Sequence, residues 1–188
     1  LKRVPDSPWI DFLSGENPNF PIRALEREFE TIRRKIEGVK ADTSTPDTRL
    51  CDDTLKYNPA INSCLTQLMM GGLTPRHGEA LNCRVRYFDP ENRRAGIPAD
   101  VAALVENLSA DQTVVTLVNV NQVEGREVIV QAGAYGEHQI PAVSVDGRKV
   151  SCDSPYTTLQ LSPGAGARVT LNMGRYVNQP TFTFPWDR

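Results

Sequence analysis

The spacing of apolar residues changes once along the chain, and this change limits the possible folds more than any other feature. Within residues 21–40 apolar side chains recur at spacings of three and four, at Ile22, Leu25, Phe29, Ile32, Ile36 and Val39. This spacing predicts one amphipathic helix of about five turns, with Pro21 in its first turn. After Ala80 apolar and polar residues alternate instead, which is typical of strands buried on one face.

A second, shorter helix is expected before the spacing changes. Pro59 would occupy its first turn and Gly71 would end it, so helices are expected over about 21–40 and 59–70. Two such helices form an α-helical hairpin with more apolar surface than they can bury on each other. Residues 1–79 are therefore interpreted as a helical segment. Its free apolar face would pack on the rest of the chain, on a preceding domain or on another copy of the chain.

Residues 80–188 are predicted to form an antiparallel β-sandwich domain of about seven to eight strands. Its clearest hairpin signal is the dipeptide Asp146-Gly147. The expected strands are 81–88, 113–120, 126–131, 138–145, 148–152, 157–161, 167–173 and 181–184. Residues 98–107 are expected to form a short helix. The predicted fold class is mainly β, with this sandwich preceded by the helical hairpin.

Charge and hydropathy narrow the range of partners. The 188 residues include 21 Lys and Arg against 23 Asp and Glu, which gives a formal net charge of -2. This balance lacks the broad positive field of sequence-independent DNA or RNA binding, so no nucleic-acid partner is expected. No stretch approaches the ~18 apolar residues of a membrane span, so none is expected. Because the chain begins at Leu1 without an initiator Met, we interpret it as a processed chain or a piece of a longer one.

The number and spacing of the four cysteines indicate in which cellular compartment the protein is expected. Cys51, Cys64, Cys83 and Cys152 lack the close spacing of a structural zinc site. Their even number and scattered positions favour two disulfides in a secreted protein, and so an extracellular or periplasmic location. Pairing Cys51 with Cys64 would close a local loop and leave Cys83 and Cys152 to link strands. Four free thiols are the alternative.

Two His–Glu pairs are the candidate catalytic or metal-binding residues. His77 and Glu79 lie in a loop before the first expected strand, and Glu137 and His138 lie at the start of another. If the fold brings the loops together, they could form a metal site or an acid–base pair. A hydrogen-bonded structural histidine is the alternative at each position. No nucleophile, phosphate-loop or dinucleotide motif accompanies them, so no cofactor is expected.

One basic cluster also stands out. Its members are Arg84, Arg86, Arg93 and Arg94, and they flank Tyr87 and Phe88. Such a cluster could hold a carboxylate or a phosphate. The alternative is a structural corner in which nearby acidic residues pair with the arginines.

Several segments together resemble a known kind of domain. They are Thr116-Leu-Val-Asn119, Arg126-Glu-Val-Ile-Val130, Ala142-Val-Ser-Val-Asp-Gly-Arg148, Leu159-Gln-Leu-Ser-Pro-Gly164 and Arg168-Val-Thr-Leu171. This pattern resembles the C-terminal β-sandwich of large secreted bacterial glycoside-active enzymes, over about residues 110–175. The resemblance implies that residues 21–70 are the last helical hairpin of a helical catalytic domain, such as an (α/α) toroid. It also implies that the sandwich is non-catalytic, and it places no catalytic residue in this chain.

Three functions follow from these observations. The first is a non-catalytic C-terminal supporting region of a larger secreted, carbohydrate-active bacterial protein, with no activity in the isolated chain and carbohydrate as a possible ligand of the whole. The second is a structural or self-assembling extracellular protein. The third is a small metal-dependent enzyme that uses the His–Glu pairs.

Overall fold

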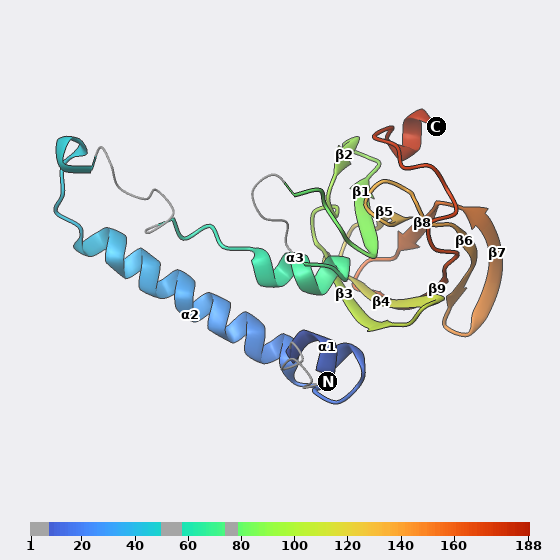
Figure 1. Cartoon of the computed structure of the whole chain (residues 1–188), viewed down its shortest axis with the longest axis horizontal. Helices are drawn as coiled ribbons and strands as arrows, with labels where there is room; N and C mark the ends of the chain where they lie inside the picture. Colours follow the sequence, from blue (N-terminus) through green and yellow to red (C-terminus); the bar gives the residue numbers. More distant parts are fainter. Residues whose placement is uncertain (1–7, 50–57, 74–78) are drawn as a thin grey trace, which may run out of the picture.

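The computed structural model describes residues 8–49, 58–73 and 79–188, and helices precede strands along the chain (Figure 1). The helices are α1 (Pro8–Leu13), α2 (Phe20–Ala41), η1 (Pro46–Arg49), α3 (Ser63–Met70) and the C-terminal η2 (Pro185–Asp187). The strands are β1 (Val85–Asp89), β2 (Arg94–Ala95), β3 (Val101–Leu108), β4 (Gln112–Asn119), β5 (Arg126–Ala132), β6 (Ile140–Val145), β7 (Arg148–Ser154), β8 (Tyr156–Leu161) and β9 (Gly166–Asn172). Among the described residues, no helix combines the length and apolarity that crossing a bilayer requires.

The strands form two antiparallel sheets. One sheet has the order β2-β1-β5-β8 and the other has the order β3-β4-β9-β6-β7. The prediction of a mainly β, antiparallel two-sheet fold after a helical region is therefore confirmed. The described part of the chain contains nine strands, because β2 and β3 were not expected as strands and residues 181–184 form none.

A single apolar core joins the two sheets and the helical segment. Both sheets contribute alternate residues to it, as the two-residue period predicts. The fully buried members include Val85, Tyr87, Val128 and Val130 from one sheet and Val105, Val115, Leu117, Val169 and Leu171 from the other. Trp9 and Leu13 of α1 and Leu68 of α3 belong to the same core. These two short helices are therefore packed on the sandwich.

The end of α3 is fixed closely against the sandwich. Gly71 ends the helix in the left-handed region at φ 60° and donates its N–H to the Gln67 carbonyl. The buried Tyr87 hydroxyl donates to the Met69 carbonyl at 2.6 Å. The N–H of Arg84 donates to the Met70 carbonyl at 3.0 Å. These bonds join α3 to the residues that lead into β1.

The helix α2 has little cover. Its 22 residues make it about 33 Å long. None of its side chains is buried, and Phe29 and Val39 are 55% and 49% exposed. Figure 1 shows α2 leaving α1 and running away from the sandwich. The predicted bounds of this helix agree with the structure to within one residue at each end.

Hydrogen bonds to the Glu28 carboxylate hold α2 to α3. The Asn62 side chain makes no cap hydrogen bond at the start of α3. Instead, the Glu28 carboxylate of α2 accepts the Cys64 N–H at 3.0 Å and the Ser63 hydroxyl at 3.3 Å. A carboxylate is favourable at a helix N-terminus because the first N–H groups there lack intrahelical partners. The second predicted helix thus begins at Ser63 and not at Pro59.

Three other local predictions are wrong. Residues 98–107 were expected to be helical, but β3 occupies most of this range and pairs with β4 from Val101 to Leu108. The pairing buries Val101 and Val105, which outweighs the helix preference of the intervening alanines. The strand expected over 81–88 begins only at Val85, and the strand expected over 181–184 is absent from the described structure.

Candidate functional site

The predicted acid–base residue Glu137 is used to hold its own loop. Its two carboxylate oxygens accept the N–H groups of Ala134 at 3.2 Å and Tyr135 at 2.8 Å. Gly133, at φ 82°, allows this turn, because a Cβ atom there would clash with the Glu137 carboxylate. The Glu137 side chain therefore stabilises a tight turn between β5 and β6.

His138 is also bound on one side. The side chain is buried, and its Nδ1 atom accepts the Tyr176 N–H at 3.0 Å. Burial lowers the pKa of His138, and the charges of Arg84 and Arg175 lower it further against the opposing effect of Glu137. The imidazole is therefore neutral at pH 7. Since Nδ1 is an acceptor, the ring proton resides on Nε2.

Of the two predicted pairs, the structure places Glu79 apart from Glu137 and His138. Glu79 lines a pocket between α2 and α3, with Phe20 and Cys64, and not the region around Glu137 and His138. His77 lies outside the described residues. Among the residues that the structure does describe, no group of three His, Cys, Asp or Glu side chains could hold a metal ion. A role for His77 stays a prediction.

The cysteines correct the prediction of disulfides. Cys64, Cys83 and Cys152 are free thiols, so the predicted Cys83–Cys152 bridge is wrong. Cys83 is buried beside β1, whereas Cys152 lies on β7 and its thiol donates to the Tyr156 carbonyl at 3.4 Å. Cys51, the predicted partner of Cys64, lies outside the described residues.

Three members of the basic cluster make structural contacts within the chain. Arg94 pairs with the buried Asp89 at 3.1 Å, and Arg93 pairs with Asp187 at 3.0 Å. Arg86 donates to the Ala134 carbonyl at 3.0 Å. The alternative of an ion-paired structural corner is thus correct for Arg93 and Arg94, whereas Arg86 is held by a backbone carbonyl and not by an acidic residue. Among the described residues, the Arg84 side chain forms no ion pair, and it lines a different pocket, beside Trp9.

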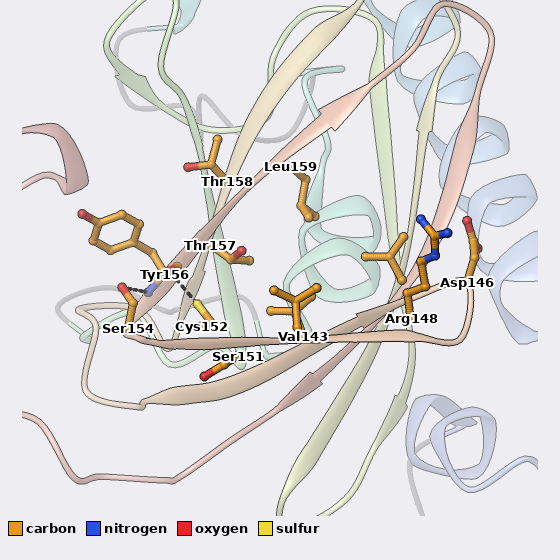
Figure 2. Close-up of a pocket in the computed structure, with 12 residues that line it drawn as sticks. Val143, Asp146, Arg148, Ser151, Cys152, Ser154, Tyr156, Thr157, Thr158 and Leu159 are labelled. Carbon is orange, nitrogen blue, oxygen red and sulfur yellow. Dashed lines mark hydrogen bonds between the residues drawn. The ribbon is translucent and has the colours of Figure 1, made fainter.

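A groove of about 880 Å³ lies where the two sheets end in β7 and β8 (Figure 2). Serine and threonine hydroxyls line much of it, together with valine and leucine side chains. The hydroxyl residues are Ser151, Ser154, Thr157 and Thr158. Asp146 and Arg148 lie at one end of the groove. The groove thus combines hydroxyl groups with a larger apolar surface, which suits a neutral ligand that has both polar groups and apolar faces.

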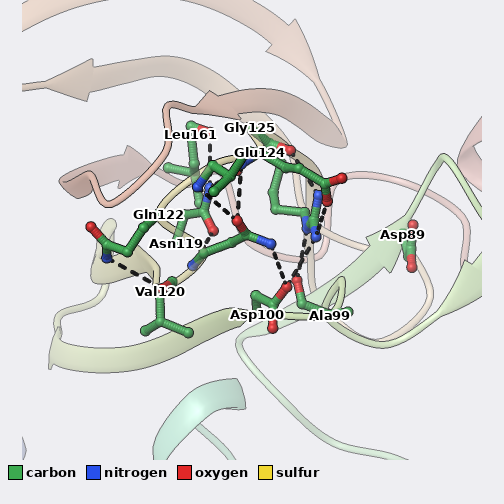
Figure 3. Close-up of polar contacts among 12 residues, drawn as sticks. Asp89, Ala99, Asp100, Asn119, Val120, Gln122, Glu124, Gly125 and Leu161 are labelled. Carbon is green, nitrogen blue, oxygen red and sulfur yellow. Dashed lines mark hydrogen bonds and ion pairs between the residues drawn. The ribbon is translucent and has the colours of Figure 1, made fainter.

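A polar network closes the other end of the sandwich (Figure 3). Asn119, at the end of β4, is fully buried and donates to the carbonyls of Glu124 at 2.8 Å and Ser162 at 3.2 Å. Its side-chain oxygen accepts the Asn121 N–H at 3.0 Å. Next to it Arg126 pairs with Asp100 at 3.0 Å. The asparagine of the Val-Asn segment is therefore structural.

Comparison with known proteins gives one match. The model of a family described as "Domain of unknown function (DUF8034)" matches residues 2–66, which is 65 of the 188 residues. The match spans α1, α2 and the first part of α3, and it ends before the sandwich begins. No curated protein and no solved structure matches the chain.

Proposed function

We propose that this chain is a non-catalytic supporting region of a larger protein, and that α2 docks on helices of a domain that precedes it in the same polypeptide. The observation that carries this proposal is the largely exposed apolar face of α2, here called the α2 stripe. The α2 stripe consists of Ile22, Leu25, Phe29, Ile32, Ile36 and Val39. Most helical stability in proteins comes from packing of such a face, so a 22-residue helix with no buried side chain needs a partner.

The spacing of the α2 stripe supports another helix as the partner. Its members alternate at intervals of three and four over nearly three heptads, as do the core positions of helix pairs. Charged residues flank it at the positions that border such a seam, including Glu26, Arg33 and Lys40. The family model that matches residues 2–66 covers α1 and all of α2 and ends before the sandwich, which supports treating the helical segment as a unit.

Two candidate catalytic residues, Glu137 and His138, already accept hydrogen bonds from the backbone, and this supports a non-catalytic role. Both oxygens of Glu137 accept backbone N–H groups, and Nδ1 of buried His138 accepts another. If the isolated chain hydrolysed or cleaved a glycoside and the Glu137→Gln variant abolished this activity, the proposal would be overturned. Folding of the variant would be checked by circular dichroism. No turnover by either protein is the expected result.

The molar mass of the chain in solution distinguishes between two partners of the α2 stripe, a preceding domain and another copy of the chain. We expect the chain to be a monomer in light scattering over a hundredfold range of concentration, with the coding sequence before Leu1 encoding a helical domain. Oligomers that form with rising concentration and disappear in the Phe29→Glu variant would show instead that the α2 stripe binds another copy. Arg34→Glu, on the polar side of α2, is the matched control.

The resemblance of residues 110–175 supports a secreted, carbohydrate-active parent protein, and the groove between β7 and β8 is where the chain could contact a glycan. Its hydroxyl lining fits a neutral sugar. We expect Ser151→Ala with Thr158→Ala to weaken oligosaccharide binding by the parent protein, measured by calorimetry, while Ser162→Ala on an outer turn does not. Equal binding by all three proteins would rule the groove out.

A further inference from the structure

We propose that a small pocket between α1 and the sandwich binds one oxyanionic group, a carboxylate, sulfate or phosphate, through Trp9, Arg84, Arg175 and His138. The pocket has a volume of about 270 Å³. This size suits a single anionic group or the end of a larger molecule, because whole drug-sized ligands need about 300–1,000 Å³. This inference is independent of the function proposed for α2.

Two buried donors of this pocket lack partners. Trp9 is only 9% exposed, and its Nε1–H has no hydrogen-bond acceptor in the described structure. The same holds for the buried Nη1 atom of Arg84. Both side chains line the pocket. An orphaned buried N–H is unfavourable, and a charged one more so, so the two atoms indicate a missing acceptor.

The remaining polar lining also favours an anion. Arg175 lies on the same pocket with its guanidinium 5.2 Å from the Tyr176 ring centre. Burial lowers the pKa of Arg84, and the positive charge of Arg175 lowers it further. Neither arginine forms an ion pair within the described ranges. An anion between the two would relieve their repulsion and accept hydrogen bonds from both.

His138 adds a further donor. Because its Nδ1 accepts the Tyr176 N–H, the neutral ring can donate only through Nε2, and the side chain lines the pocket. The nearest carboxylate that acts on His138 is Glu137, whose two oxygens are already bound to backbone N–H groups. No acidic side chain lines the pocket among the described residues.

The two tryptophans of the chain allow a direct test. In ¹⁵N-labelled protein each gives one indole N–H signal, and Trp9→Phe assigns them. Sodium sulfate, phosphate and acetate are titrated at constant ionic strength against sodium chloride. We expect a saturable shift of the Trp9 signal and no shift of the Trp186 signal. Saturation by acetate alone would identify a carboxylate ligand, and saturation by sulfate or phosphate a tetrahedral anion; either result supports the pocket.

Variants that remove one positive charge distinguish specific anion binding in the pocket from a nonspecific effect of salt on the protein. Arg84→Gln and Arg175→Gln should each weaken the apparent affinity about tenfold or more, because each removes a charged donor. Arg34→Gln, which removes an exposed arginine on α2, should leave it unchanged. An unshifted Trp186 signal checks that each variant is folded. The proposal would be overturned by the absence of a saturable shift with any of the three anions. It would also be overturned if the Arg84→Gln and Arg175→Gln variants bound the anion as tightly as the unsubstituted protein.

Discussion

Asn119 is the residue on which one end of the sandwich depends. Its side-chain NH₂ group donates hydrogen bonds to three backbone carbonyls, those of Glu124, Leu161 and Ser162. Its side-chain oxygen accepts the Asn121 N–H. These groups come from the β4–β5 connection and from the end of β8. This single buried side chain therefore supplies hydrogen-bond partners to backbone groups that the turns leave without backbone partners.

We expect Asn119→Ala to lower the free energy of unfolding by about 3 kcal/mol, because several buried groups would lose their partner. Urea denaturation measures this loss. Asn82→Ala, at an exposed position, should change stability by less than about 0.5 kcal/mol. Similar small effects of both substitutions would show that the network is not important for stability.

His138 links stability to pH. Its folded-state pKa lies below its ordinary value of 6.5, first because of burial. The unfolded chain therefore takes up the proton more readily, so the contribution of neutral His138 is complete above its ordinary pKa and is lost as the pH falls through the lowered folded-state pKa. In His138→Asn, which retains an acceptor for Tyr176, stability should fall less over this range. Parallel pH profiles from urea denaturation would contradict this prediction.

The free thiols should differ in reactivity. Burial raises the pKa of Cys83 to about 12, with the charge of Glu137 adding to the effect. Only about one molecule in ten thousand would then carry the thiolate at pH 8. With iodoacetamide, mass spectrometry of each cysteine peptide should show the half-buried Cys152 modified well before Cys83. Equal rates in the native protein, with equal rates also in urea, would contradict the burial of Cys83.

At the scale of elements, two contacts in its first half hold α2 to the other helices. The aromatic ring of Phe20 lies 6.3 Å from that of Phe12 in α1, and Glu28 binds the start of α3. Beyond this point Phe29, Ile36 and Val39 of the α2 stripe are exposed. The helix is thus fixed near the sandwich, and within the described part of the chain these side chains are accessible to a partner.

Glu28→Ala should cost about 1 kcal/mol of stability, the usual effect of removing a helix N-cap. It should also increase amide exchange in the first turn of α3, since the Cys64 N–H loses its acceptor. Glu30→Ala, an exposed position on the same helix, is the control. Unchanged exchange at Cys64 in the Glu28→Ala protein would mean that the two helices are held by other contacts.

The elements also show what could be predicted from sequence. The bounds of α2 and most strands were predictable because a regular apolar period reports directly on one face. The strand β3 was not, because Ala102 and Ala103 favour a helix locally and only pairing with β4 decides the outcome. The pocket of Trp9, Arg84 and Arg175 could not be predicted either, since the topology alone brings these distant residues together.

At the scale of the whole molecule, one core unites the sandwich with α1 and α3, while α2 projects from it (Figure 1). The packed part contains Glu137 and His138, two of the residues that first suggested catalysis, and their side chains accept backbone N–H groups of nearby loops. The projecting part bears a seam suited to another helix. A supporting region that presents one helix to a preceding domain combines these two properties.

Amide hydrogen exchange over residues 22–39 decides whether another helix covers the α2 stripe. It should be compared between the 188-residue chain and a polypeptide extended through the coding sequence before Leu1. We predict fast exchange in the 188-residue chain and exchange slower by about tenfold or more in the extended protein, because docking would protect a helix that is otherwise free to open. Equal exchange in the two proteins would contradict docking of α2 on a preceding domain.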